Sequence, residues 1–340
     1  MKGKTDPVIL PAGKLAPKLL EQFLRRLPTD GPEVLVGPGV GEDAAVLVST
    51  AETVVVTTDP VTFVSDAPVA WLVQINVNDI AAMGARPRYL ALMALFPEGR
   101  TSAPGVESMF EELAEVCRRL GIIVIGGHTE VTPAVNHPVL VCIMLGEAPR
   151  DHIHRSADAR VGDAILLAGW AAHEGSAIIA RERPAEARRL LGEDGARAVA
   201  AWADFPNLLV MDAALTLAGR PGVHALHDAT ESGVAGAVRE VMRASGCGCV
   251  LRQEEIPVRP EAVRLCRHFG LDWRGVIASG LLVATVAPDQ AEEARRALSE
   301  KGISCALAGK VIAKGLLLET PTGTVELPDF PVDEITRLPV

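Results

Sequence analysis

The chain has 340 residues, 49% of them hydrophobic and 22% charged, and its formal net charge at pH 7 is -10. This length favours two domains, and the apolar content is sufficient for two cores. The negative charge argues against a nucleic-acid-binding protein, which normally presents a basic face. It does not exclude an anionic substrate, because a local basic patch or a metal ion can reverse the local field.

The termini and the cysteines indicate a cytoplasmic protein. Residues 1–7 lack the apolar core of a signal peptide, and no apolar run reaches the roughly 18 residues that span a membrane. Six cysteines are scattered along a chain too long to need disulfides, so we expect reduced, mostly buried thiols. We therefore predict a cytoplasmic protein with neither membrane nor nucleic-acid partners.

The first half of the chain predicts an α+β domain that covers residues 1–155. Its predicted elements are, in chain order, a helix at 17–27, strands at 44–48 and 53–58, a helix at 71–84, a strand at 88–96, a helix at 105–120, a strand at 122–125, a loop at 126–130 and a strand at 139–145. This order mixes hairpin and crossover connections, which is typical of an α+β sheet rather than a doubly wound one.

The second half, residues 156–340, predicts another α/β domain. Its predicted elements are a strand at 164–168, helices at 174–202 and 207–218, a strand at 223–226, a helix at 234–244, a strand at 249–251, a helix at 260–269, a strand at 280–286, a helix at 290–301, a strand at 305–311 and a terminal hairpin at 315–327. The hairpin is expected to turn at a Thr-Gly pair.

The helix at 71–84 is apolar nearly all round, and neither Lys nor Arg occurs between Ala70 and Ala85. Such a helix is usually buried. It nevertheless carries Asn76, Asn78 and Asp79, and a buried carboxylate needs a partner, a proton or a metal ion. The alternative interpretation is a core helix whose polar residues cap a neighbouring loop.

Four aspartates occur next to predicted strand ends, turns and the buried helix: Asp43, Asp59, Asp79 and Asp228. Any one of them alone would be interpreted as a cap. Together they suit Mg²⁺, which prefers oxygen ligands and is commonly held by a few carboxylates plus substrate phosphates. The glycine-rich stretches 37–41 and 126–127 could present backbone N–H groups to an anion. The set predicts a metal–nucleotide site without a basic stripe.

Three common nucleotide or hydrolase motifs are absent. The sequence contains no Gly-x4-Gly-Lys-Ser/Thr, its 37–41 turn is not Gly-x-Gly-x-x-Gly, and Ser279 lacks the first glycine of a nucleophile elbow. His128 could face a substrate and His173 could line the cleft, or both could serve the fold, whereas Cys247 and Cys249 lack the second pair or nearby His that would complete a metal site.

Five motifs appear in order, at residues 39–46, 57–59, 77–85, 126–130 and 227–233. They resemble the motif series of the aminoimidazole ribonucleotide synthetase superfamily of ATP-binding enzymes, over almost the whole chain. Within it, the segments 227–233 and 277–282 most resemble the hydrogenase-maturation HypE family. The resemblance implies two α/β domains, the first of which forms a homodimer through its sheet in a barrel-like interface, with ATP in a long cleft there.

The resemblance also implies roles for individual residues. Mg²⁺ ions on the ATP phosphates would be held by Asp43, Asp59, Asp79 and Asp228. The phosphates themselves would lie near Gly41, Asn78, Gly127 and Thr129. Glu130 would lie near the reacting end of ATP and, with Asp79, act in catalysis. Lys14 could reach a phosphate from the N-terminal segment, or it could be a solvated lysine.

The C-terminus departs from the HypE pattern. HypE proteins end in a Pro-Arg-Ile-Cys-like tail whose cysteine receives a carbamoyl group, whereas this sequence ends Arg337-Leu-Pro-Val340 and its last cysteine is Cys305. We therefore expect an intact ATP site without a thiol carrier at this end.

The function expected from the resemblance is that of an Mg-ATP-dependent enzyme. It would activate or phosphorylate an oxygen of an unidentified acceptor, in metallocentre maturation with a partner protein. Two alternatives stay open. One is a small-molecule kinase or synthetase resembling thiamine-monophosphate kinase, and the other is a non-catalytic, nucleotide-binding assembly partner.

Overall fold

The computed structural model describes residues 10, 13–15, 17–38, 46–48, 51–61 and 69–338. The chain divides into two compact units, the first formed by Met1–Ile80 with Pro87–Glu147 and the second by Ala81–Arg86 with Ala148–Val340. A domain boundary after residue 155 stays a prediction. No helix in the described ranges is long and apolar enough to cross a membrane.

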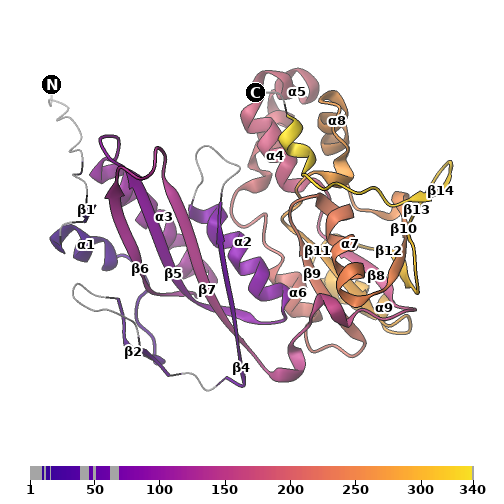
Figure 1. Ribbon diagram of the computed structural model, residues 1–340, viewed down its shortest axis with the longest axis horizontal. Coiled ribbons are helices and arrows are strands. Elements are labelled where there is room, and N and C mark those ends of the chain that lie inside the picture. Colours follow the sequence, from indigo (N-terminus) through magenta and orange to yellow (C-terminus); the bar gives the residue numbers. More distant parts are fainter. Residues whose placement is uncertain are drawn as a thin grey trace. The chain divides into compact units, whose positions relative to one another are not determined.

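Within the described residues, the first unit contains a five-stranded mixed sheet with helices packed on it (Figure 1). The strands lie in the order β1 (Gly13–Lys14), β6 (Ile123–Thr132), β5 (Arg86–Pro97), β7 (Val139–Ala148) and β4 (Thr53–Pro60). The helices are α1 (Pro17–Leu24), α2 (Val69–Ala82) and α3 (Ala103–Leu120), and a separate pair of short strands is β2 (Val34–Val36) and β3 (Val46–Leu47). β5 and β6 are parallel, and β1 is antiparallel to β6.

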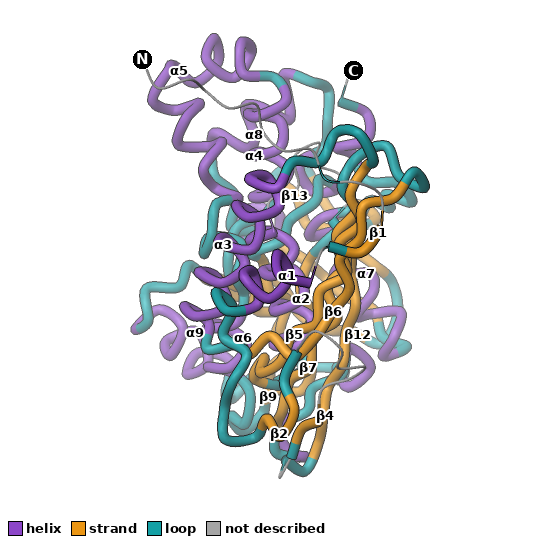
Figure 2. The backbone as a smooth tube through the Cα atoms, turned by 90° about the vertical axis from the view of Figure 1, so that its left-hand side faces the viewer, coloured by secondary structure: helices purple, strands orange, loops and turns teal. Residues whose placement is uncertain are grey.

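Among the segments that the structure describes, α2 and α3 cover one face of this sheet, as Figures 1 and 2 show. On the covered face of β7, Leu140, Cys142 and Met144 are buried, whereas Ile143 between them is 39% exposed. This alternation follows from the two-residue period of a strand. The opposite face is apolar and accessible.

Helix α2 confirms the expectation of a buried helix. Its residues Leu72, Val73, Val77 and Ile80 are fully buried. Glu112 of α3 accepts hydrogen bonds from backbone amides at the α2 N-terminus, where the helix dipole favours a negative charge. Burial still raises the pKa of Glu112, and those hydrogen bonds oppose the rise. A carboxylate from a neighbouring helix thus fixes where α2 begins.

The predicted loop at 126–130 is wrong, because β6 continues through it to Thr132. Leu90 pairs with Val124 but Ala91 pairs with Gly126, so β6 carries one extra residue relative to β5 at this point. At Gly127, φ is +148° and an added Cβ would lie 2.0 Å from the carbonyl oxygen of Leu92. The two glycines therefore mark a β-bulge and a close backbone approach.

The second unit is built on a seven-stranded sheet. Its strands lie in the order β14 (Gly323–Glu326), β13 (Leu316–Thr320), β10 (Gly248–Arg252), β12 (Cys305–Ile312), β8 (Ala164–Ala168), β11 (Leu281–Val286) and β9 (Val223–Ala229). Its helices are α4 (His173–Glu182), α5 (Pro184–Ala200), α6 (Met211–Leu217), α7 (Gly233–Ser245), α8 (Pro260–His268) and α9 (Ala291–Glu300). β10 and β13 are parallel, and the other pairs described are antiparallel.

Both faces of the central strands in this sheet are buried. Ile165 and Leu167 of β8 belong to a cluster with residues of α7, whereas Leu166 and Ala168 belong to a cluster with residues of α6 and α9. Every side chain of β11 is buried. Two units with mixed sheets and unevenly distributed helices confirm the predicted α+β class. The predicted terminal hairpin is also confirmed, as β13 and β14.

The segment after β14 is held against the N-terminus of α7. The Ser232 hydroxyl donates to the carbonyl of Phe330 at 2.6 Å, and the Ser232 backbone N–H donates to Asp333 at 2.6 Å. Asp333 is 4% exposed, and burial raises the pKa of its carboxyl group. Ser232 has φ +62°, a left-handed conformation that costs a non-glycine residue roughly 1–2 kcal/mol. The hydrogen bonds of Ser232 therefore stabilise the contact with the C-terminal segment, whereas its left-handed backbone conformation is unfavourable.

Substitutions at Ser232 should separate these two effects. Ser232→Ala should lower the free energy of unfolding of the second unit by about 1 kcal/mol, because it removes the hydrogen bond to Phe330 and keeps the positive φ. Ser232→Gly loses the same bond but releases the strain, so it should stay near wild type. Urea unfolding followed by circular dichroism measures both, and a glycine variant less stable than the alanine variant would contradict the assignment.

Candidate metal–nucleotide site

Two of the predicted metal ligands converge where α2 crosses β4. The Thr57 hydroxyl lies 2.8 Å from Oδ2 of Asp79 and 3.4 Å from Oδ2 of Asp59. The two carboxylates therefore lie within two hydrogen-bond lengths of one another. Both aspartates are only partly buried. Because like charges disfavour each other at this range, the pair favours a bound cation.

Asn76 ties the strand to the helix at the same place. Its side-chain oxygen accepts the backbone N–H of Asp59 at 3.1 Å, and its side-chain nitrogen donates to the Leu72 carbonyl at 2.9 Å. Asn76 is fully buried. The amide thus fixes the backbone of Asp59 relative to α2, and its two bonds satisfy polar groups that burial would otherwise penalise.

A thiol borders the same site. Cys142 of β7 is fully buried, and burial raises the pKa of its thiol, with further contributions from Cys117, Asp59 and Asp79. Cys142 therefore stays protonated at neutral pH and is neither a nucleophile nor a charged metal ligand there.

The structure does not bring Glu130 to this pair of aspartates within one chain. Glu130 pairs in register with Leu95, two residues beyond Met93, on the accessible face of the sheet. Asp59 is on β4, three strands away from β6, a lateral separation of roughly 14 Å at about 4.8 Å per strand. Glu130 instead lies 3.2 Å from Nε2 of His128.

The other predicted phosphate-binding residues are divided among several places. Thr129 pairs with the buried Ala94 and therefore points to the helix-covered face. Gly127 allows the backbone of β6 to lie close to the carbonyl of Leu92 in β5. Lys14 pairs with Glu130 across β1 and β6. Asn78 is fully buried, two positions from Asn76, so the two side chains do not share a face of α2.

Three predicted positions lie elsewhere. Asp43 and Gly41 are outside the described residues. Asp228 belongs to the second unit, where it is 8% exposed. It lies in β9 and pairs in register with Leu282 of β11. Strand β9 ends three residues later than predicted, at Ala229. Their roles stay predictions.

The described residues fit Mg²⁺ as a partial ligand set. No group of three or more His, Cys, Asp or Glu side chains in the described ranges is placed to hold a metal ion. Mg²⁺ is, however, commonly bound by one or two carboxylates, with water and substrate phosphates completing the octahedron. Asp59 and Asp79 match that pattern, and Asn76 and Thr57 hold them in place.

Thr57 and Asn76 were not predicted as site residues, although a signal for each exists. Thr57 is two residues before Asp59, so both side chains point to the same face of β4. Asn76 is three residues before Asp79, so both lie on one side of α2. Periodicity measured from the two aspartates would have found both.

The comparisons with known proteins agree with this fold. The N-terminal domain of AIR synthase related proteins matches residues 41–148, and their C-terminal domain matches residues 160–317. Carbamoyl dehydratase HypE from Escherichia coli (strain K12) is 32% identical over 268 residues, 75% of this chain and 74% of that protein. The chain therefore belongs to the family of AIR synthase related proteins that includes the carbamoyl dehydratases HypE, which confirms the predicted resemblance.

Solved structures agree with this family. The crystal structure of E. coli HypE has a TM-score of 0.75 at 26% identity and covers 94% of this chain and 99% of its own. At 24% identity, a HypE structure in complex with ATP also gives 0.75, covering 94% of this chain and 96% of its own. A HypE–HypF complex at 20% identity (TM-score 0.67, covering 86% and 94%) and a Stenotrophomonas maltophilia thiamine-monophosphate kinase at 21% (TM-score 0.71, covering 90% and 97%) share the fold.

Removing the shared hydroxyl should weaken cation binding. Thr57→Val should reduce Mn²⁺ affinity at least tenfold, because a hydrogen bond to a charged group contributes about 1.5–3 kcal/mol and 1.4 kcal/mol is tenfold. Thr57→Ser keeps the hydroxyl and is the matched control. Electron paramagnetic resonance of free Mn²⁺ reports the affinity, and equal binding by the two variants would show that Thr57 serves the fold alone.

Proposed function

We propose that this protein is an Mg-ATP-dependent enzyme that activates a carbonyl oxygen of its substrate by phosphorylation, in the manner of a carbamoyl dehydratase. The convergence of Asp59 and Asp79 on Thr57 carries the proposal. In this assignment, Asp59 and Asp79 would hold Mg²⁺, which would supply positive charge to neutralise the triphosphate. The carbonyl oxygen attacks the γ-phosphorus, the bond from that phosphorus to the β,γ-bridging oxygen breaks, and ADP leaves. The carbamoyl nitrogen gives up its two protons to solvent and the phosphorylated oxygen leaves as inorganic phosphate, so a carbon–nitrogen triple bond forms and the carbamoyl group has lost the elements of water.

The family supports this chemistry. The relatives that share about three quarters of the chain include carbamoyl dehydratases, and a HypE structure with the same fold contains ATP. Phosphoryl transfer needs positioning and charge neutralisation more than covalent participation by the protein. A pair of partly exposed carboxylates, held by an amide and a hydroxyl, suits that role better than it suits nucleophilic catalysis.

A partner protein is part of the proposal. HypE is known in a complex with HypF, and we infer that this chain works with a similar partner protein in hydrogenase maturation. Thiamine monophosphate is the competing small-molecule substrate, because a thiamine-monophosphate kinase shares the fold.

Asp79→Asn should abolish the Mg²⁺-dependent part of ATP binding, with a loss of at least tenfold in affinity measured by calorimetry, because a neutral amide cannot replace a carboxylate on the metal. Asp289→Asn makes the same charge change at an exposed position and is the matched control. Unchanged Mg-ATP affinity in Asp79→Asn would overturn the metal assignment.

Release of ADP from the wild-type protein separates the candidate functions. Turnover that requires a carbamoyl-loaded HypF-type partner is the expected result. Turnover with thiamine monophosphate alone would instead assign a kinase. Mg-ATP binding without turnover in either arm would assign a nucleotide-binding assembly partner.

We also propose that the accessible face of the first unit's sheet forms a homodimer. Four apolar side chains on this face are strongly exposed: Val54 at 50%, Val56 at 61%, Met93 at 40% and Ile143 at 39%. A contiguous apolar face of this kind marks an interaction site in a soluble domain. Glu130 and His128 project from the same face, so a second copy would lie next to them.

Met93→Glu should convert the dimer to a monomer, because it places an uncompensated charge in the centre of the apolar contact. Light scattering after size exclusion should then report 35.9 kDa instead of twice that mass. Val161→Glu, at a position that is 61% exposed in the second unit, is the control and should leave the mass unchanged. A wild-type protein that is already monomeric would refute the interface.

A further inference from the structure

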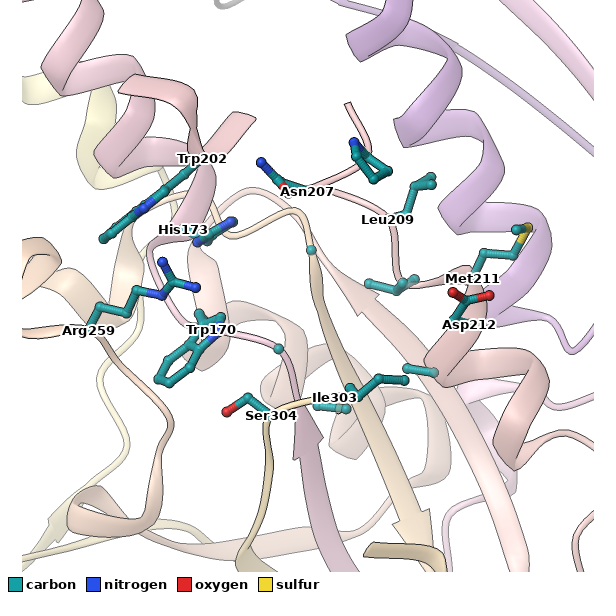
Figure 3. Close-up of a pocket in the computed structure, with 16 residues that line it drawn as sticks. Trp170, His173, Trp202, Asn207, Leu209, Met211, Asp212, Arg259, Ile303 and Ser304 are labelled. Carbon is teal, nitrogen blue, oxygen red and sulfur yellow. The ribbon is translucent and has the colours of Figure 1, made fainter. Parts of the chain in front are cut away.

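A cavity of about 360 Å³ lies wholly within the second unit (Figure 3). It opens between the end of β8, the start of α4, the segment that leads into α6, and the residues before α8 and β12. Its volume is within the range of about 300–1,000 Å³ that small-molecule sites occupy. Neither Asp59 nor Asp79 takes part in it.

One wall of the cavity is a stack of rings around a guanidinium group. The Arg259 guanidinium carbon lies 4.8 Å from the ring centroid of Trp170 and 4.7 Å from that of Trp202. On Trp202, the imidazole of His173 stacks at 5.1 Å with an interplanar angle of 10°. Figure 3 shows the guanidinium between the two indoles. The rings hold the guanidinium by its faces, which leaves its N–H edges available.

Two polar groups of this wall lack partners. Within the described part of the chain, the guanidinium of Arg259 makes neither a hydrogen bond nor an ion pair, although the residue is half-buried, whereas its backbone carbonyl accepts from the N–H of Val263. His173 is only 5% exposed, and its Nδ1 has no hydrogen-bond partner. A buried polar atom without a partner costs about 1–3 kcal/mol, so a polar atom of a ligand would relieve that cost.

The pKa shifts agree with an uncompensated cation. Burial lowers the pKa of Arg259, against a smaller opposing effect of Glu261. Burial and, to a smaller extent, the charge of Arg259 together lower the pKa of His173 to about 4, against a smaller opposing effect of a hydrogen bond with the Trp202 backbone. His173 is therefore neutral at pH 7, and Arg259 contributes the single positive charge of this wall.

The rest of the cavity is mainly apolar. Apart from the ring stack, its lining includes the apolar side chains of Leu209, Val210, Met211 and Ile303, together with the polar Asn207 and Ser304. Asp212 is exposed, and in Figure 3 it lies at the right of the cavity, whereas Arg259 lies at the left. Part of the cavity lining is the backbone of Gly169 and Gly280. These two segments approach so closely that a Cβ added at Gly169 would lie 2.0 Å from the carbonyl oxygen of Gly280.

We propose that this cavity binds a small monocarboxylate with an apolar body, its carboxylate on the free edge of Arg259 and beside His173. A planar carboxylate matches the guanidinium fork. Its one negative charge balances the one positive charge of the wall, whereas a phosphate dianion would leave a charge uncompensated in a poorly hydrated site. The apolar body would contact Leu209 and Ile303. This site is separate from the ATP assignment and does not depend on it.

Three probes of similar shape test the charge requirement without ATP: benzoate, the neutral benzamide and the dianionic phenyl phosphate. Two of the four tryptophans of the chain flank Arg259, so fluorescence excited at the indole edge should report binding, with calorimetry as the second readout. Benzoate should bind saturably, and benzamide and phenyl phosphate at least tenfold more weakly. Tighter binding of phenyl phosphate, equal binding of benzamide, or no binding of benzoate would overturn the proposal.

Variants of Arg259 complete the test. Arg259→Gln should weaken benzoate binding at least tenfold, and Arg259→Lys, which keeps the charge but lacks the fork, should weaken it severalfold. Arg243→Gln removes the same charge from an exposed position on α7 and should bind as wild type. If Arg259→Gln does not fold by circular dichroism, the lysine variant decides. Wild-type affinity in every folded Arg259 variant would make the ring stack a purely structural feature.

Discussion

A single hydroxyl, that of Thr57, lies between the carboxylates of Asp59 and Asp79. A neutral hydroxyl leaves both carboxylate charges in place, which is the charge pattern that the proposed divalent cation would balance. The other features of the first unit serve this junction. Burial of α2 fixes the helix against the sheet, Glu112 fixes where it begins, and Asn76 fixes the Asp59 backbone beside it. Apolar packing around the two carboxylates on the covered face offsets the repulsion between them.

The sequence predicted much of this arrangement, because its strongest signals coincide with large energy terms. Helix α2 was recognisable since a helix with apolar residues on all sides has to be buried. The seven-stranded sheet of the second unit was largely recognisable from its short β-branched runs. Asp59 and Asp79 were found as candidates because carboxylates in such segments need an explanation.

What could not be predicted depends on contacts between distant segments. Gly126 and Gly127 were expected to form a loop, and the reason for their presence, the carbonyl of Leu92 at 2.0 Å, is visible only after β5 and β6 pair. The stack of Arg259 with its flanking rings also depends on contacts between distant segments. Trp170, Trp202 and Arg259 are far apart in the sequence and carry no shared periodicity, so only the folded chain brings them together. The face of the sheet on which Glu130 lies could not be predicted either, because neighbouring residues of one motif can point to opposite faces of a strand.

The two units present opposite electrostatic problems. In the first, two carboxylates lie together with a neutral thiol and a neutral amide around them, so the junction attracts cations. In the second, a guanidinium without a carboxylate is enclosed by rings that cannot neutralise it. A chain with a net charge of -10 has ample acidic residues to pair with Arg259, as its many surface ion pairs show. Partly buried arginines such as Arg181 and Arg239 pair with carboxylates, whereas Arg259 is fixed between two indoles and makes no ion pair within the described part of the chain. We attribute this difference to a ligand rather than to the stability of the fold.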